Sequence, residues 1–119
     1  MALRKLPSVF FRTETGREPV REWLQKLPKL ERKIIGVDIM TVQFRWPLGL
    51  PLVDHIGAGL WEIRSRLPNR IARTLFFVDE GELVLLHGFI KKTRKTPNED
   101  RTLALWRKNA YIKTNPEKE

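Results

Sequence analysis

The sequence predicts an α+β domain in which helices cover one face of a small antiparallel sheet. Three observations lead to this prediction. The 119 residues are enough for about one domain with a single core. Residues 29–46 repeat apolar side chains at a helical period. Residues 60–92 instead alternate with the period of two that is typical of strands, and short turns interrupt them. The predicted element order is β-α-α-β-β-β-α.

The first half of the chain is predicted to hold one strand and two helices. Residues 8–12 are rich in β-forming side chains and are followed by turn residues. A helix over 19–27 begins with a proline suited to a first turn, and its apolar residues recur at spacings of three and four. The helix over 29–46 is long and, by its broad apolar stripe, largely buried. Residues 47–59 are rich in Pro and Gly and predict a connection with at most one brief strand.

The second half predicts a meander followed by a helix. Three strands are expected, joined by short turns: Leu60–Leu67, Arg70–Val78 and Leu83–Lys92. Thr96, Pro97 and Glu99 then predict an N-cap, a proline at the first helical position and a capping-box partner. Apolar residues on one face of this helix, namely Leu103, Trp106 and Ala110, predict that it packs back on the domain. Residues 113–119 are expected to be a frayed tail of a single domain that spans 1–119.

Composition narrows the classes of function. Lys and Arg number 23 against 14 Asp and Glu, and the net charge is +9. Because this excess lies in the body of the chain, it favours phosphate-rich or acidic partners, although a soluble basic surface is an equal reading. Cysteine is absent, which excludes disulfides and thiolate chemistry. Two histidines make a zinc site unconvincing, so we expect neither metal nor cofactor. No apolar run is long enough for a membrane span, so we expect a cytoplasmic protein without membrane contact.

Basic side chains collect along the predicted meander. A period of two places Arg64 beside Glu62 and away from the apolar side of its strand. Arg73 interrupts the next strand, which suggests that its side of the sheet opens there. A basic run, Lys91, Lys92, Arg94 and Lys95, follows the last strand and could position phosphate or simply block strand pairing.

Other candidates have plainer readings beside the functional one. Arg66 and Arg70 are more often surface charges than site residues. His87 fits a hydrogen-bonded, half-buried histidine at least as well as a catalyst. Phe89 is equally consistent with the core and with a base-stacking platform.

The chemistry open to such a set is metal-free cleavage of RNA. No cluster of carboxylates suggests a magnesium site. Cations can stabilise the charge that develops when the ribose 2′-OH attacks the adjacent phosphate, and a lysine or histidine can move the protons. RNA would then be cut, and DNA would only be bound.

Three segments resemble the signature series of HigB-like toxins in the RelE/ParE superfamily, in its phage-derived branch: LWEIR at 60–64, RTLFFV at 73–78 and LLHGFIKKTRKTP at 85–97. The resemblance extends over about residues 8–112. It implies the same element order and a type II toxin–antitoxin system. The toxin would enter the ribosomal A site and cut mRNA without metal. A cognate antitoxin, often with a helix-turn-helix domain, would neutralise it and contact operator DNA on its behalf.

The resemblance also implies roles for individual residues. Arg64 and Arg73 would hold the scissile phosphate, with Lys91 assisting proton transfer and His87 a weaker catalytic candidate. Lys92 would bind RNA. The residue pattern, apart from the resemblance, adds five further RNA-binding candidates: Arg94, Lys95, Arg66, Arg70 and Phe89. The chain lacks the C-terminal tyrosine or histidine that several members use as acid or base, since its only tyrosine is Tyr111. Two alternatives stay open: a non-enzymatic gyrase inhibitor of the ParE kind, and an inactive nucleic-acid-binding or antitoxin-binding relative.

Overall fold

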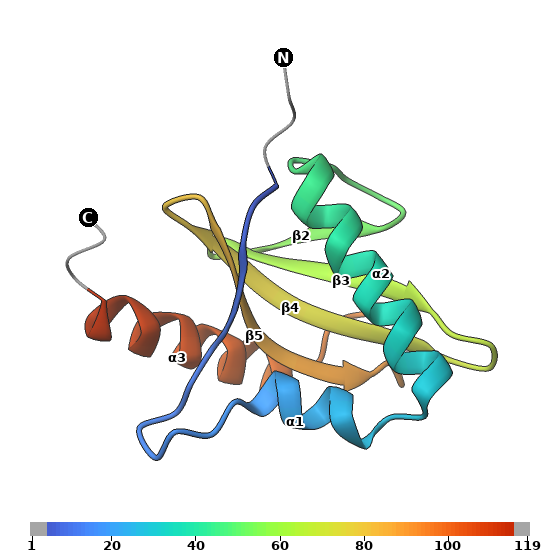
Figure 1. The fold of residues 1–119 in the computed structure, drawn as a ribbon, viewed down its shortest axis with the longest axis horizontal. Coiled ribbons are helices and arrows are strands. Elements are labelled where there is room, and N and C mark those ends of the chain that lie inside the picture. Colours follow the sequence, from blue (N-terminus) through green and yellow to red (C-terminus); the bar gives the residue numbers. More distant parts are fainter. Residues whose placement is uncertain (1–4, 116–119) are drawn as a thin grey trace.

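A computed structural model describes residues 5–115 and confirms the predicted α+β class (Figure 1). One sheet holds five strands, and three helices pack on it. The strands are β1 Ser8–Phe10, β2 Val53–Gly57, β3 Leu60–Arg66, β4 Ile71–Asp79 and β5 Glu82–Ile90. The helices are α1 Pro19–Lys26, α2 Lys29–Arg45 and α3 Asn98–Thr114.

Helices α1 and α2 lie where the sequence predicts them. Pro19 occupies the first turn of α1, and Leu27 ends the helix in an extended conformation because Pro28 follows it. The prediction that α2 is largely buried is wrong for half of its surface. Its inner side contributes Ile35, Ile39 and Val42 to the core. Its outer side leaves large apolar side chains exposed: Leu30, Val37, Met40 and Phe44.

The sheet contains the predicted meander and two strand pairings that were not predicted. Strands β3, β4 and β5 pair antiparallel in sequence order, and β2 adds to the outer edge of β3. Strand β1 pairs with β5 in parallel, so the sheet is mixed and not purely antiparallel. The alternation of residues gives the direction of side chains but not the partner of a strand, which explains both differences.

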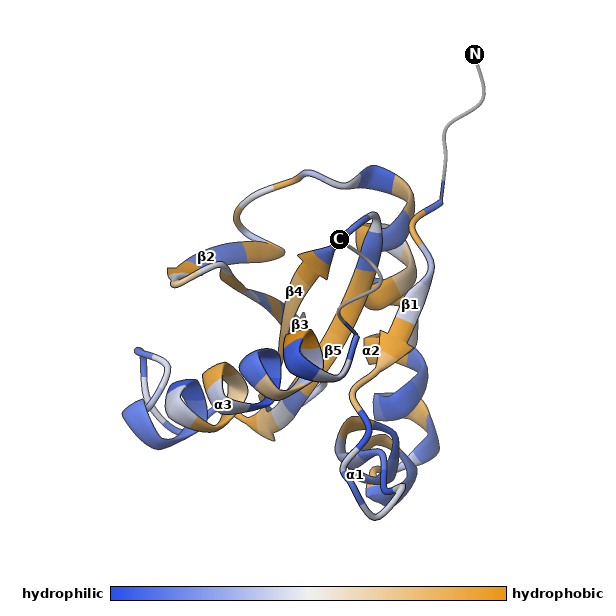
Figure 2. Cartoon of the chain, turned by 90° about the vertical axis from the view of Figure 1, so that its left-hand side faces the viewer, coloured by the Kyte–Doolittle hydropathy of each residue, from blue (hydrophilic) through white to orange (hydrophobic). Residues whose placement is uncertain are grey.

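Helices cover both faces of the sheet, which corrects the prediction that they cover one. Figure 2 shows the sheet with α3 on one side and α1 and α2 on the other. Ile35 of α2 packs with Ile63 and Phe76 in one cluster, whereas Tyr111 of α3 packs with Leu75 in a second. Strands β4 and β5 are apolar toward both faces, so each face must be buried.

Helix α3 covers only part of its face of the sheet. Ala104 and Tyr111 are its buried residues, and Trp106, predicted to lie on the face that packs on the domain, is 64% exposed. Beyond the helix, the same face of β3 and β4 carries Glu62 and Arg73, which are 0% and 1% exposed. A charged pair this deeply buried must be covered by something other than α3, and the segment between β5 and α3 covers it.

Candidate nucleic-acid interface

The polar part of the α3 face is assembled by strand register. Arg64 of β3 stands directly opposite Arg73 of β4, and Arg73 stands opposite Phe89 of β5. Opposed residues of an antiparallel pair share a face of the sheet. Arg64 therefore lies on the same side as Glu62, as the alternation predicts, and the charged residue inside β4 faces the same way.

The side chain of Glu62 lies at the centre of this group. Its Oε1 accepts a hydrogen bond from the Thr96 hydroxyl at 2.7 Å, and its Oε2 accepts one from Arg64 Nε at 3.1 Å. Arg73 Nη1 lies 3.3 Å from Oε1. Burying a carboxylate is costly unless charged and hydrogen-bonding partners surround it. Two hydrogen bonds and one ion pair provide these partners, from β3, β4 and the segment that precedes α3.

Arg73 connects the sheet to that segment. Its Nη2 donates to the carbonyl oxygen of Arg94 at 2.6 Å and to that of Thr93 at 3.4 Å, and its Nη1 donates to Thr96 Oγ1 at 3.3 Å. We call Glu62, Arg73 and Thr96 the clasp. The clasp fixes the backbone of the basic run against β4, because a guanidinium that donates to two carbonyls is held in one orientation.

The predicted N-cap at Thr96 is therefore wrong. Pro97 is the residue before α3, and no side chain caps the helix. The Thr96 hydroxyl donates to Glu62 instead, 34 residues away in the chain. An N-cap side chain accepts a hydrogen bond from a backbone N–H, but Thr96 Oγ1 instead accepts one from Arg73 Nη1 at 3.3 Å while its hydroxyl donates to Glu62.

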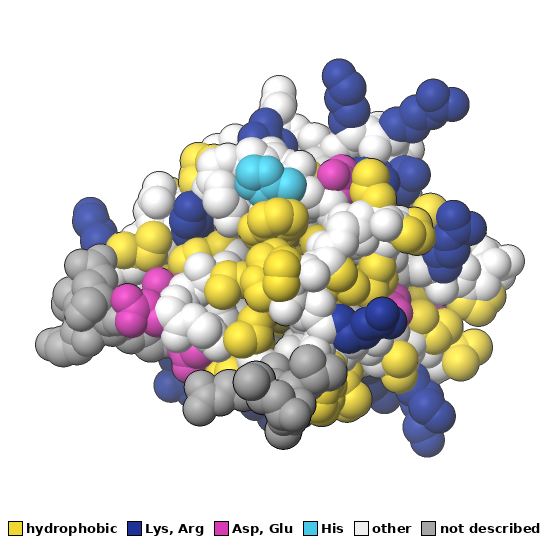
Figure 3. Space-filling model, turned by 90° about the horizontal axis from the view of Figure 1, so that it is seen from above, with side chains coloured by type: hydrophobic (Ala, Val, Ile, Leu, Met, Phe, Trp, Pro, Cys, Tyr) yellow, Lys and Arg dark blue, Asp and Glu magenta, His cyan; other side chains and the backbone are white. Residues whose placement is uncertain are grey.

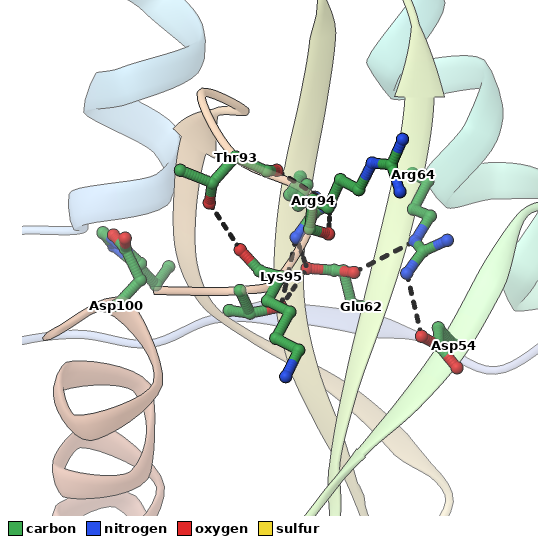
Figure 4. Close-up of polar contacts among 10 residues, drawn as sticks. Asp54, Glu62, Arg64, Thr93, Arg94, Lys95 and Asp100 are labelled. Atoms are coloured by element: carbon green, nitrogen blue, oxygen red, sulfur yellow. Dashed lines mark hydrogen bonds and ion pairs between the residues drawn. The ribbon is translucent and has the colours of Figure 1, made fainter. Parts of the chain in front are cut away.

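A groove lies on the outer side of the clasp. Arg64 is 34% exposed and donates to Asp54 Oδ2 at 2.9 Å as well as to Glu62, as Figure 4 shows. The groove has a volume of about 480 Å³. Its lining residues are Asp54, His55, Ile56, Arg64, Arg94, Lys95, Thr96, Asn98 and Arg101. We call it the cationic groove, because four basic side chains line it against one carboxylate, which suits an anionic ligand.

The positive charge of the molecule is not confined to this groove. On the face seen in Figure 3, Lys and Arg side chains project around the rim, and apolar side chains occupy the middle. The cationic groove differs from that surface in geometry. Its basic groups come from β3, α3 and the basic run, and the clasp holds the run in place.

A second recess lies at the start of α3. Its volume is about 420 Å³, and its lining residues are Trp23, Gly88, Phe89, Ile90, Lys92, Pro97, Glu99 and Asp100. We call it the edge pocket. Asp100 Oδ1 lies 2.6 Å from His87 Nε2, and the imidazole stacks on Phe89 with 5.4 Å between ring centroids. Burial lowers the pKa of His87, the Asp100 carboxylate opposes this effect and the Arg107 charge adds to it. The neutral imidazole is thus favoured in the folded protein.

Comparison with protein families shows which family the chain belongs to. The family model described as "Phage derived protein Gp49-like (DUF891)" matches residues 22–109. The chain belongs to this family. The Gp49-like family is typically associated with toxins of the RelE/HigB type. No curated protein matches the chain. The matched region of the Gp49-like protein includes the clasp, both recesses and all ten residues that the sequence singles out.

The structure divides those ten residues between several places. Arg64, Arg94 and Lys95 meet in the cationic groove, and Phe89 and Lys92 line the edge pocket. Arg66 lines a separate hollow of about 240 Å³ beside α2. Arg70 forms two hydrogen bonds with Glu31, at 2.6 and 3.1 Å, outside both recesses.

Three of the residues expected to be catalytic are buried or half-buried. Arg73 is 1% exposed and bonded on both sides, so it does not reach a phosphate in this arrangement. His87 is 16% exposed and paired with Asp100, and it is absent from the lining of the cationic groove. Lys91 is half-buried, and its backbone N–H donates to the carbonyl of Ile71 at 2.7 Å.

Sequence reasoning missed several lining residues of the groove. Asp54 and His55 lie on β2, a strand hidden in a stretch rich in Pro and Gly. Arg101 could have been found, because it follows Pro97 by one helical turn and so points toward the end of the basic run. Its Nη2 donates to the carbonyl of Ile56 at 2.9 Å, which ties α3 to β2.

Within residues 5–115, no group of three His, Asp or Glu side chains lies close enough together to hold a metal ion. Across the same residues, no helix has both the length and the apolar character needed to cross a bilayer.

Proposed function

We propose that this Gp49-like protein is a HigB-like toxin of a type II toxin–antitoxin system, a ribosome-dependent endoribonuclease that cuts mRNA without metal. The observation that supports the proposal is the cationic groove, where the clasp holds the backbone that carries Arg94 and Lys95. A flexible basic tail attracts polyanions in general, whereas fixed cations can match the charge of one phosphate in its transition state.

In the proposed reaction, the ribose 2′-OH attacks the adjacent phosphorus and the 5′-oxygen leaves, which gives a 2′,3′-cyclic phosphate. Arg94, Lys95 and Arg101 stabilise the charge on the phosphorane. Arg64 orients the phosphate from the floor of the groove, because Asp54 and Glu62 already balance much of its charge. No other nucleophile is required, so DNA would bind without being cut.

In this scheme His55 takes the proton of the attacking 2′-OH and returns it to the departing 5′-oxygen. Its exposed side chain lines the groove and packs on Trp61 with 4.4 Å between ring centroids. Imidazole is the side chain best suited to proton transfer near neutral pH. Arg73 is assigned a positioning role in place of direct phosphate contact, and Lys91 and Lys92 are assigned RNA contacts beside the groove.

Induced expression tests the proposal. The wild-type protein is expected to arrest translation and to create new mRNA 5′ ends at codons in the ribosomal A site. The double variant Arg94→Ala/Lys95→Ala should abolish both effects. Lys29→Ala/Lys33→Ala on the exposed surface of α2 removes the same charge and should abolish neither, which separates the groove from net charge.

Other outcomes would support the competing functions. DNA damage and filamentous cells with unchanged mRNA ends would indicate a gyrase inhibitor of the ParE kind. Normal growth under strong expression would indicate an inactive relative.

The proposed partners are the ribosome, mRNA and a cognate antitoxin with a helix-turn-helix domain, which contacts operator DNA. This assignment expects a small reading frame beside the gene whose product stops mRNA cleavage when co-expressed. A complex that cleaves mRNA at the full rate would contradict it.

A further inference from the structure

The edge pocket lies on an open part of the sheet. Strand β1 pairs with β5 only at Leu83–Leu85, and among the described residues no strand pairs with the outer side of β5 beyond that point. Helix α1 and the start of α3 flank this open edge and supply the walls of the pocket. Its volume of about 420 Å³ lies within the range of small-molecule sites, roughly 300–1,000 Å³.

Two aromatic rings and a cation line the pocket. Phe89 projects from β5, and the parallel His87 ring supports its orientation. Trp23 reaches across from α1 and lies against Gly88, where any side chain would clash with the indole ring. Lys92 stands at the same pocket. Aromatic rings beside a cation are the arrangement on which single-stranded nucleic acids stack their bases and place their phosphates.

The polar wall of the pocket consists of carboxylates. Asp100 is fixed through Oδ1 by His87, and no described residue donates a hydrogen bond to its Oδ2. Glu99 is exposed beside it. Ionised carboxylates only accept hydrogen bonds, so they select ligands that present N–H groups. Guanine presents N1–H and an exocyclic amino group side by side, adenine and cytosine present an amino group, and uracil presents only N3–H.

We infer that the edge pocket is a nucleobase-binding site that selects guanine over uracil, with Phe89 stacking on the base, Trp23 forming the wall at the other face of β5, and Asp100 and Glu99 accepting the N–H groups of the base. The inference rests on the proposed function in that the ligand is RNA. Figure 4 shows Asp100 and Arg64 on opposite sides of the Thr93–Lys95 backbone. Base selection and phosphate binding therefore use separate recesses and can be tested separately.

The test uses the full-length protein and four 2′-O-methyl pentanucleotides of sequence UUXUU, where X is G, A, C or U, because these ligands cannot be cleaved. Fluorescence anisotropy measures each affinity. The wild-type protein is expected to bind the G ligand about tenfold more tightly than the U ligand, a moderate value for a paired contact to one base. Asp100→Asn and Glu99→Gln should each reduce that ratio, and together bring it below about twofold.

Controls distinguish selection from general attraction. Glu80→Gln, in the exposed turn between β4 and β5, removes the same charge and should leave the ratio unchanged. Arg94→Ala should weaken binding of all four ligands by a similar factor, because a phosphate contact carries no base information. If Asp100→Asn disturbs folding, as its circular dichroism spectrum would reveal, the exposed Glu99→Gln still decides the outcome.

The possible failures differ. Equal wild-type affinity for the four ligands, or a G preference that survives in the Asp100→Asn/Glu99→Gln double variant, would overturn the base site and leave the proposed nuclease intact. Failure of the wild-type protein to bind any of the four ligands would overturn the base site, while mapping of mRNA ends in cells would still decide the proposed function.

Discussion

The two faces of the sheet belong to the same strands but are stabilised in different ways. The face toward α1 and α2 buries apolar side chains such as Ile63 and Phe76. The face toward α3 is apolar around Leu75 and then buries the Glu62–Arg73 pair under the basic run. A buried ion pair adds little net stability compared with an apolar pair of similar volume. The second face therefore has less apolar packing than the first, and its buried ion pair holds a surface segment in place.

The largest effect should follow from Arg73→Leu. It leaves the buried Glu62 carboxylate with Arg64 but without Arg73, and breaking a buried ion pair costs about 3–5 kcal/mol of unfolding free energy. Urea denaturation measures the loss. The Glu62→Leu/Arg73→Leu double variant should recover part of that stability and still fail to arrest translation, because the basic run remains unheld. A double variant as unstable as Arg73→Leu alone would show that the pair does stabilise the fold.

A second variant tests the clasp with a smaller expected loss of stability. Thr96→Val keeps the shape of the side chain but removes the hydroxyl that bonds Glu62, at a cost of about 1–3 kcal/mol. Trypsin should then cleave folded protein after Arg94 or Lys95 faster than in the wild type. Thr96→Ser retains the hydroxyl and should behave like the wild type. Equal protection of the Val and Ser variants would argue against the clasp.

RNA binding in the cationic groove should depend on salt concentration in a way that identifies the basic side chains involved. Binding of single-stranded RNA should weaken as salt rises, with a slope of about −0.7 in log K per phosphate neutralised. Arg101→Ala should make that slope less steep by nearly the contribution of one phosphate. Arg70→Ala should hardly change the slope, because the Arg70 side chain pairs with Glu31 in the wild type. Anisotropy titrations at several salt concentrations measure both slopes. Equal slopes for the two variants would contradict the assignment of Arg101 to the groove.

The smallest effect concerns acid stability. Because burial lowers the pKa of His87 below its ordinary 6.5, the unfolded chain takes up a proton at a higher pH than the folded protein does. This contribution to stability is complete above about pH 6.5 and is lost as the pH falls toward the folded pKa. His87→Gln should therefore flatten the decline of unfolding free energy between pH 7.5 and 5.5. His55 is present in both proteins, so the difference isolates His87.

Local patterns predicted the elements well, and contacts between distant segments decided the site. The spacing of apolar residues located α1 and α2, and alternation put Arg64 beside Glu62 on one face of β3. The same alternation could not tell that Arg73 is covered, because the covering segment lies some 20 residues further along the chain. Thr96 illustrates the limit best, since a local capping rule competes there with a carboxylate that no local window contains.

By itself, the sequence determined the α+β class, the meander, the excess of positive charge and, through its signature segments, a resemblance to the phage-derived branch of the RelE/ParE toxins. These properties depend on residue type and short-range periodicity. Only the tertiary structure decided that helices cover both faces, that Arg73 is buried beneath the basic run, and that Arg94 and Lys95 share a groove with Arg101 and His55. Such arrangements arise from strand pairing and from partners far apart in the chain, which periodicity does not encode.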